Sequence, residues 1–490
     1  MVSYSRRIFL TSLLAAAATP ALSQSVLRPL ARPARIHPAL RQTPTQMLQQ
    51  ARLGNGVSYL AARLSDGQVI EGNNPGMALA PASTAKAVTA LYALDRLGAD
   101  FRFETLVLGQ GVVEAGTLQG TLMLAGGGDP ILSTPDLVAM VDQLHAAGVR
   151  RVNGTFSYFD GALPAITEID PGGQLPQAGY NPAISGLNLN FNRVHFEWTR
   201  AGGAWNLAMD ARGGNVTPAV SIATMALADR GAPTFSYRQD GVIDRWTVAS
   251  GALGNGGSRW LPVRSPGAYA ADVFRTLCAA RGITLPTPQP EGRLIAGNVY
   301  ARHQSPELLI MLRDMLEYST NITAEVIGLT AARRDNPGVV SLPQSAAAMA
   351  EWVLLQHGAQ MRLVDHSGLG GAAQIAPDQM VRLLRGGADG PLRGILRPVV
   401  LTDAEGDRLP NPDTQVAAKT GTLNFTSALV GYIDPPAGED LVFAIFSSDP
   451  AARQAARLDE VPAGSRAWNA RARRLQQQLI QRWGALYSTM

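Results

Sequence analysis

Ser83 and Lys86 are the first residues in this chain whose types and spacing could do chemistry. On a helix, positions i and i+3 share a face, so the hydroxyl and the amine can reach hydrogen-bonding distance. A serine is a weak nucleophile until a neighbouring group takes its proton, and a lysine with a lowered pKa can take it. Arginine cannot, because its guanidinium stays protonated in proteins. The pair therefore predicts a serine nucleophile with a lysine base, at a helix start whose free N–H groups can polarise a carbonyl.

A second lysine motif, Lys419-Thr420-Gly421-Thr422, begins a strand-like run. A strand edge that contains glycine lets a substrate backbone lie alongside it. An ammonium and hydroxyl groups can hold a carboxylate. We expect this motif to bind the carboxylate end of an extended substrate.

Between the two lysine motifs, Ser319 and Asn321 form a Ser-x-Asn at a predicted helix start. A purely structural interpretation makes Ser83 and Ser319 helix caps and leaves the lysines on the surface. Lys86 and Lys419 are, however, the only lysines of the chain, and the other 40 of its 42 basic residues are Arg. Their coincidence with the first and third motifs favours the chemical interpretation.

These three motifs, in this order, resemble those of penicillin-binding proteins and class A β-lactamases. The chain is more similar to the D-alanyl-D-alanine carboxypeptidase/endopeptidases of low-molecular-mass class C, the serine peptidase family S13, because 232 residues separate Lys86 from Ser319. The resemblance covers roughly residues 50–485. Further similar segments are 126–130, 187–192, 266–271, 321–325 and 365–369.

The resemblance implies an α/β fold of the penicilloyl-serine transferase (β-lactamase/transpeptidase-like) type. Its catalytic domain has an antiparallel sheet with helices and is interrupted by a large β-rich insertion in two parts. The implied substrates are peptidoglycan stem peptides, and β-lactam antibiotics are the implied inhibitors. No cofactor and no metal are implied.

The resemblance also implies roles for single residues in cleaving the bond between the last two D-alanines. Ser83 attacks the carbonyl, Lys86 is the base, Ser319 relays a proton, and Asn321 binds Lys86 and the substrate amide. The terminal carboxylate is held by the motif Lys419-Thr420-Gly421-Thr422, through Lys419, Thr420 and Thr422. Backbone N–H groups of Ser83 and Thr422 form the oxyanion hole.

Two positions depart from the family pattern. Gly370-Gly371 stand where relatives usually continue with Ser-Arg. Thr155 stands at the position that is often acidic in relatives. The second departure puts in doubt the recognition of a diamino-acid side chain by its amino group.

The chain organisation places these motifs in an interrupted domain. Residues 1–23 are predicted to be a signal peptide of the twin-arginine type, or an ordinary secretory signal, so we expect an exported, periplasmic or otherwise extracytoplasmic protein. A Pro/Arg-rich linker follows over 24–45. We expect the catalytic domain over 46–105 and 295–490, an insertion over 106–194 and 249–294, and a second nested insertion over 195–248.

Periodicity predicts the elements that carry the motifs. They are a hairpin over 57–72 and helices from Pro81 to Gly98 and over 135–147, 268–281, 306–315, 320–333, 342–357 and 377–384. A final hairpin joins the runs 422–433 and 441–448. A last helix over 465–486 is expected to pack an apolar stripe on that sheet, or alternatively to lie on a membrane surface.

Composition excludes several function classes. Without residues 1–23, which hold two Arg and no acid, 40 basic residues face 38 acidic ones, which argues against nucleic acid as a partner. The single Cys278 is expected to be a buried hydrophobe, and the six His show no metal-ligand or Ser-His-Asp spacing. Alternative functions are a non-catalytic cell-wall binding protein on the same fold and a β-lactam hydrolase.

Overall fold

The computed structural model describes residues 38–403, 405–410, 412–456 and 459–488. It divides the chain into two compact units, Met1–Arg41 and Gln42–Met490, and everything below concerns the second. The predicted signal peptide and most of the predicted linker lie outside the described residues. Helix α2 (Pro44–Ala51), capped by Thr43, begins inside the last residues of that linker. In the described part of the chain, no helix is long and apolar enough to cross a membrane.

The catalytic motifs lie around a six-stranded antiparallel sheet. Its strand order is β15-β16-β17-β18-β1-β2, so strands from the two ends of the chain meet where β18 pairs with β1. The residues between these two ends of the chain are therefore inserted between strands of one sheet. The strands are β1 (Val57–Arg63), β2 (Val69–Asn73), β15 (Arg397–Pro398), β16 (Gln415–Leu423), β17 (Thr426–Asp434) and β18 (Leu441–Ser448).

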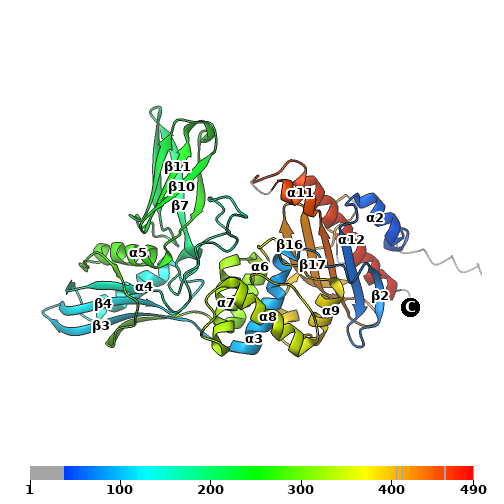
Figure 1. Ribbon diagram of the computed structural model, residues 1–490, viewed down its shortest axis with the longest axis horizontal. Helices are drawn as coiled ribbons and strands as arrows, with labels where there is room; N and C mark the ends of the chain where they lie inside the picture. Colours follow the sequence, from blue (N-terminus) through cyan, green and yellow to red (C-terminus); the bar gives the residue numbers. More distant parts are fainter. Residues whose placement is uncertain (1–37, 404, 411, 457–458, 489–490) are drawn as a thin grey trace, which may run out of the picture. The chain divides into compact units, whose positions relative to one another are not determined.

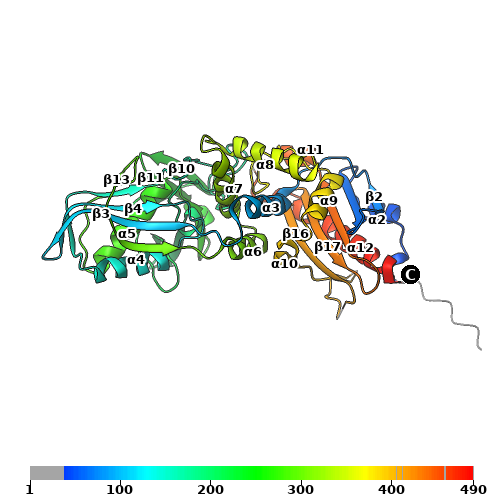
Figure 2. The same ribbon diagram turned by 90° about the horizontal axis from the view of Figure 1, so that it is seen from below.

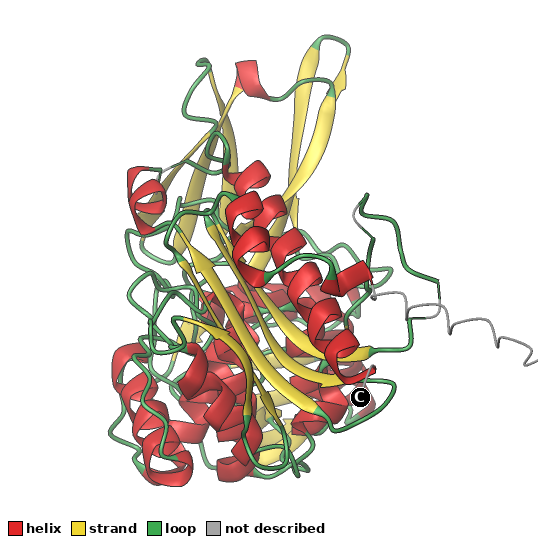
Figure 3. Cartoon of the chain, turned by 90° about the vertical axis from the view of Figure 1, so that its right-hand side faces the viewer, coloured by secondary structure: helices red, strands yellow, loops and turns green. Residues whose placement is uncertain are grey.

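Helices cover both faces of this sheet (Figures 1 and 2). One face packs against α3 (Ala85–Leu97), α6 (Leu308–Tyr318), α7 (Asn321–Asp335), α8 (Leu342–His357), α9 (Pro377–Gly386) and α10 (Leu392–Ile395). Figure 3 shows the long helix α12 (Ser465–Ser488) lying across the other face. Its stripe, including Trp468, Leu475 and Trp483, is buried with α2 against the sheet. The predicted packing of the last helix is thus confirmed.

A second sheet, with order β13-β6-β4-β3-β14 and β5 beside β4, lies between the first and second motifs. Helices α4 (Thr134–Ala146) and α5 (Pro266–Ala280) pack with it around a separate core that includes the buried Cys278. Its strands are β3 (Glu104–Glu114), β4 (Thr117–Gly126), β5 (Arg151–Asn153), β6 (Phe156–Phe159), β13 (Gln289–Pro290) and β14 (Asn298–Gln304).

Two three-stranded sheets complete the middle of the chain, with orders β12-β7-β8 and β10-β11-β9. They consist of β7 (Arg193–Ala201), β8 (Ala204–Asp210), β9 (Ala223–Ala228), β10 (Phe235–Asp240), β11 (Ile243–Ala249) and β12 (Gly256–Pro262). Before β7, residues 160–189 form a long segment without regular helix or strand, which we call the insertion loop.

The predicted helices and both predicted hairpins are present, but the first strand of the final hairpin starts later than predicted. The run 422–433 is broken by a turn, because β16 ends at Leu423 and β17 starts at Thr426. Phe425 adopts a left-handed backbone there, with φ of 54°. This turn has no glycine, so the sequence lacks the usual turn signal. As a result Lys419 lies in the middle of β16 and not at the head of a strand.

Candidate active site

The nucleophile candidate Ser83 lies on a single 3-10 turn, Ala82–Thr84, that leads into α3. The turn is fixed at both ends: Thr84 Oγ1 donates to the Pro81 carbonyl at 2.7 Å, and Ala82 is fully buried. Ala82 also has a positive φ of 47°, which is uncommon for a residue other than glycine. The backbone is thus held in a sharp bend directly before Ser83. Ser83 itself lines a cavity.

Lys86 is fully buried and its amine has three hydrogen-bond partners. Nζ donates to Ser83 Oγ at 3.0 Å, to Asn321 Oδ1 at 2.7 Å and to the Ser367 carbonyl at 2.9 Å. An ammonium has three N–H donors, so these partners satisfy the charged form completely. The structure brings the first and second sequence motifs into direct contact across 235 positions of sequence.

The same three contacts fix the direction of the neutral amine. A neutral amine has two N–H groups and one lone pair. The Asn321 amide oxygen and the Ser367 carbonyl are acceptors only, so they take the two N–H groups. The lone pair is left facing Ser83 Oγ, the one partner that carries a proton to give.

Electrostatics favour that neutral form near physiological pH. Burial, followed by the nearby charge of Lys419, lowers the pKa of Lys86 to about 7, while the carboxylates of Glu325 and Asp365 act in the opposite direction. A low dielectric and a like charge both disfavour the ammonium. The free base is therefore accessible at neutral pH.

Ser319 stands between the two lysines. It ends α6 in a left-handed conformation, with φ of 59°, and α7 begins two residues later at Asn321. Lys419 Nζ donates to Ser319 Oγ at 3.1 Å and to the Thr420 carbonyl at 2.9 Å. Burial, followed by Arg397, lowers the pKa of Lys419 to about 8. The second and third motifs are therefore also in contact.

Strand β16 presents an edge to the nucleophile turn. Strand β15 pairs only with Ala417 and Ala418, so no described strand pairs with the following residues on that side. Gly421 lies directly against the turn: a Cβ there would stand 2.7 Å from the Pro81 carbonyl oxygen and 3.1 Å from Ser83 N. An extended peptide can add to this edge beside Ser83.

Replacing Gly421 by Ala is expected to slow acylation of Ser83 by about 10²-fold, because the added methyl meets backbone atoms and must push β16 away from the turn. The rate of acylation by a fluorescent penicillin in stopped flow measures this. Gly76→Ala is the matched control, since no atom lies within 4 Å of its added Cβ. A Gly421→Ala rate within twofold of wild type contradicts the close approach.

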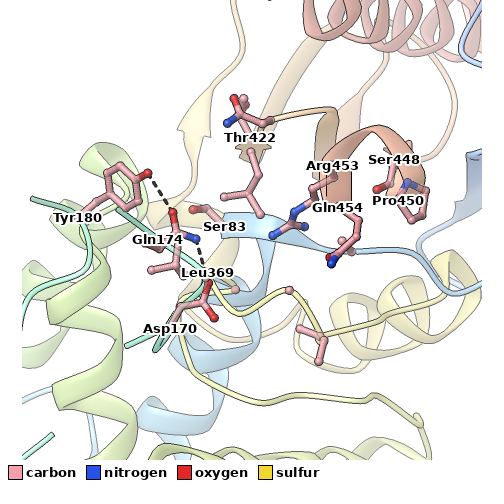
Figure 4. Close-up of a pocket in the computed structure, with 18 of the residues that line it drawn as sticks. Ser83, Asp170, Gln174, Tyr180, Leu369, Thr422, Ser448, Pro450, Arg453 and Gln454 are labelled. Atoms are coloured by element: carbon pink, nitrogen blue, oxygen red, sulfur yellow. Dashed lines mark hydrogen bonds between the residues drawn. The ribbon is translucent and has the colours of Figure 1, made fainter. Parts of the chain in front are cut away.

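A cavity of about 730 Å³ opens in front of Ser83 (Figure 4). Ser319, Asn321 and Thr422 line it, together with residues that follow β18, mainly on α11 (Pro450–Ala455). Thr420 is exposed on β16, and Lys419 is buried behind Ser319. The predicted site residues thus surround one cavity or stand directly behind its wall.

The insertion loop forms another wall of this cavity. Figure 4 shows Tyr180, Gln174 and Asp170 joined in a chain, in which Tyr180 Oη donates to Gln174 Oε1 at 3.0 Å and Gln174 Nε2 donates to Asp170 at 2.8 Å. The Tyr180 carbonyl also accepts from Asn321 Nδ2 at 2.8 Å. The insertion thus helps to orient the amide that binds Lys86.

Comparison with known proteins agrees with this geometry. The family model described as the D-Ala-D-Ala carboxypeptidase 3 (S13) family matches residues 40–463. The chain belongs to this family. The family expected from the three motifs is thus confirmed, and with it the enzyme class, a D-Ala-D-Ala carboxypeptidase.

Two S13 relatives are similar along most of the chain. A D-alanyl-D-alanine carboxypeptidase of Actinomadura is 26% identical over 448 residues, which are 84% of this chain and 81% of the relative. The D-alanyl-D-alanine carboxypeptidase DacB of Haemophilus influenzae is 24% identical, over 82% of this chain and 87% of the relative.

A solved structure confirms the predicted fold class. The crystal structure of penicillin binding protein 4 from Haemophilus influenzae superposes with a TM-score of 0.72, at 20% identity, over 90% of this chain and 99% of that one. A second structure of that protein, in complex with a β-lactam, has a TM-score of 0.69 at 21% identity, over 91% of this chain and 99% of that one.

The two departures from the S13 pattern acquire a structural context. Arg453, from α11 (Pro450–Ala455), lines the cavity, and its Nη2 lies 3.7 Å from where a Cβ on Gly371 would stand. A guanidinium from elsewhere in the chain therefore occupies space beside the two glycines. Thr155 is exposed before β6, and the acids that line the cavity are Asp170 and Glu460.

Several groups at the S13 site escaped the sequence analysis. The Ser367 and Tyr180 carbonyls are backbone atoms, which no residue type announces. Asp170 and Arg453 lie in segments with no periodic or motif signal. Glu325 lies in a segment that was similar to the family, yet that similarity assigned it no role.

Proposed function

We propose that the chain is an exported serine D,D-carboxypeptidase/endopeptidase that acts on peptidoglycan through a Ser83 acyl-enzyme and is inhibited by penicillin. The observation that carries the proposal is the buried amine of Lys86, which lies 3.0 Å from Ser83 Oγ and is held by Asn321 Oδ1 and the Ser367 carbonyl. Surface lysines and helix-capping serines have no need of such an arrangement. The relative's complex with a β-lactam is consistent with it.

In the proposed first step, Ser83 Oγ attacks the carbonyl between two D-alanines as its proton passes to Lys86 Nζ. The negative charge that develops on the carbonyl oxygen is stabilised by the N–H groups of Ser83 and Thr422. Ser319, which contacts Lys419, relays the proton that Lys86 has taken to the leaving amine, so that Lys86 is neutral again. The C–N bond breaks, D-alanine leaves, and the acyl group stays on Ser83.

Substrate orientation follows from β16 and the cavity. The stem peptide extends along the open edge of β16, and its terminal carboxylate lies near Thr422 and Thr420 in the positive field of Lys419. The cavity offers the preceding side chain both a carboxylate, Asp170, and a guanidinium, Arg453. These charges suit a side chain that carries a carboxylate and an amino group.

Water then hydrolyses the acyl-enzyme and frees Ser83. If the leaving amine belongs to a neighbouring stem peptide, the same steps cleave a cross-link, which is endopeptidase activity. Export is supported by the predicted signal over residues 1–23, and we propose a periplasmic location on that basis.

Digestion of purified peptidoglycan is expected to release D-alanine and to convert cross-linked dimers to monomers, both measured by liquid chromatography with mass spectrometry. Ser83→Ala should produce neither product. Hydrolysis of penicillin without action on peptidoglycan favours a β-lactam hydrolase. Binding to peptidoglycan without any product favours a binding protein, and either result contradicts the proposal.

A further inference from the structure

Glu325 is a fully buried carboxylate that the acyl-transfer steps leave unexplained. It lies on α7 one turn after Asn321, so both side chains project from the same face of the helix. Its Oε2 accepts from the His366 N–H at 2.9 Å and its Oε1 from the Ser367 N–H at 2.8 Å. Both oxygens accept from backbone N–H groups, while burial, followed by the nearby Asp365, raises the pKa of Glu325 to about 8.

These two hydrogen bonds hold the backbone at His366 and Ser367, and the carbonyl of Ser367 contacts Lys86. The Ser367 carbonyl accepts from Lys86 Nζ at 2.9 Å. Glu325 therefore fixes the N–H of Ser367, and the carbonyl of the same residue fixes Lys86. The chain of contacts from Glu325 to the amine passes through a single residue.

The segment 365–370 is fixed on its other sides as well. Asp365 accepts from the N–H groups of Gly368 at 2.7 Å and Gly370 at 2.6 Å. Gly368 has φ of 76°, and a Cβ there would stand 1.9 Å from the Ala82 carbonyl oxygen. The segment is thus packed directly against the nucleophile turn, where a small shift changes the geometry between Ser83 and Lys86.

Helix α7 supplies a third contact on the same face. A Cβ on Gly328 would stand 2.2 Å from the His366 ring, so the ring packs on the helix backbone. His366 Nε2 in turn lies 2.6 Å from Ser345 Oγ. Glu325 and Gly328 therefore hold the 365–370 segment along α7, on the face from which Asn321 reaches Lys86.

We propose that Glu325 is a positioning residue for the acyl transfer, which aims the Ser367 carbonyl at Lys86 and thereby turns the lone pair of the neutral amine toward Ser83 Oγ. This inference rests on the proposed function and deepens it. Asn321 alone can take one N–H of the amine. The Ser367 carbonyl takes the second, and only with both N–H groups held is the direction of the lone pair determined.

The test separates the chemical step from binding. Glu325→Gln keeps the size of the side chain but replaces one of its two acceptor oxygens with an N–H donor. In stopped flow with a fluorescent penicillin, we expect the acylation rate constant to fall by about 10²-fold while the dissociation constant of the initial complex is unchanged. The fraction of folded protein is measured by circular dichroism.

The pH profile adds a readout that a merely structural role does not move. Lys86 and Asp365 are the charged groups that face Glu325, and the His366 ring is directed to Ser345. Burial raises the pKa of Glu325 to about 8, so its negative charge forms while Lys86 loses its proton, and that charge raises the pKa of Lys86. Glu325→Gln removes this coupling, so the rising limb of the acylation rate becomes narrower and is complete at lower pH. Glu325→Asp keeps the charge but shortens the reach, and we expect it to lose rate with a smaller change in pH dependence.

Asp272→Asn is the matched control. Asp272 is also buried and accepts from Ser221 N and Oγ at 2.7 Å, but it lies on α5 in the insertion. We expect this variant to keep the wild-type acylation rate and pH profile. If Glu325→Gln does not fold, Glu325→Asp carries the test.

Two failures are distinguishable. No acylation of the wild-type protein contradicts the proposed function itself. Wild-type acylation together with folded Glu325 variants that acylate within twofold of it, with an unchanged pH profile, overturns only the role of Glu325.

Discussion

Replacing Ser83 by Ala is expected to abolish the covalent adduct with penicillin and to lower peptidase activity by about 10⁴-fold or more, the largest effect of any single substitution in this chain. The reason is that Ser83 Oγ is the atom that bonds to the acyl group, and the variant has no atom to replace it. Intact-mass spectrometry measures the result directly. The wild-type protein gains the mass of one penicillin, and Ser83→Ala gains none.

The control for this experiment is Ser65→Ala. Ser65 is an exposed serine whose Oγ donates to Glu439, and its loss leaves the cavity residues in place. We expect that variant to bind one penicillin per molecule at the wild-type rate. An adduct that persists in Ser83→Ala means that another residue is the nucleophile, and the acyl-enzyme proposal then fails.

Much of the site could be predicted because its chemistry depends on residue type. Of the two basic side chains that lysine and arginine offer, only lysine can lose its proton and act as a base beside a serine, so a chain with 40 Arg and two Lys marks both positions. Spacing then identified Ser83, three residues before Lys86. The contact of Lys86 with Asn321 was implied only by the family resemblance, because no local rule joins residues 235 positions apart.

The remainder of the site depends on backbone atoms and long-range packing. The Tyr180 carbonyl reaches Asn321 because the irregular insertion loop returns to the catalytic domain, and periodicity carries no information about an irregular segment. Arg453 lies beside Gly371 although 82 positions separate them. Such contacts arise from the tertiary fold, which single-sequence patterns do not specify.

The fold itself was predictable where hydrophobic periods are long. Helix α12 shows its stripe over more than five turns, and the structure buries that stripe as expected. The turn between β16 and β17 was missed because Asn424 stands alone there, with no Gly or Pro beside it, in a segment that otherwise reads as one strand. This affects the functional interpretation, because Lys419 lies in the middle of β16, with strand residues before and after it. Its side chain is held there against Ser319.

The second large effect concerns pH and both lysines. We expect kcat/KM to rise with pH through about 7, as Lys86 loses its proton and becomes a base, and to fall again through about 8, as Lys419 loses the charge that attracts the substrate carboxylate. Burial lowers both pKa values below the ordinary value for lysine, so both transitions fall within the accessible range. The profile is measured with a D-Ala-D-Ala peptide between pH 5 and 10.

Substitutions at Lys419 show which lysine causes the rise of kcat/KM with pH and which causes the fall. Lys419→Arg keeps the positive charge at every pH in this range, since guanidinium does not deprotonate. The falling limb should therefore disappear while the rising limb stays near pH 7. Lys419→Gln removes the charge, which is the second contribution that lowers the pKa of Lys86. Its rising limb should shift to higher pH, and kcat/KM should fall because the carboxylate loses its partner.

Lys419→Arg keeps the positive charge at position 419 and Lys419→Gln removes it, so their rising limbs are compared for the effect of that charge. A rising limb at the same pH in both variants shows that Lys419 does not set the pKa of Lys86. A falling limb that persists in Lys419→Arg assigns that limb to another group. We propose a site in which Lys86 is the base and the charge of Lys419 keeps it neutral. This site requires two results together: Lys419→Arg loses the falling limb, and Lys419→Gln raises the pH midpoint of the rising limb.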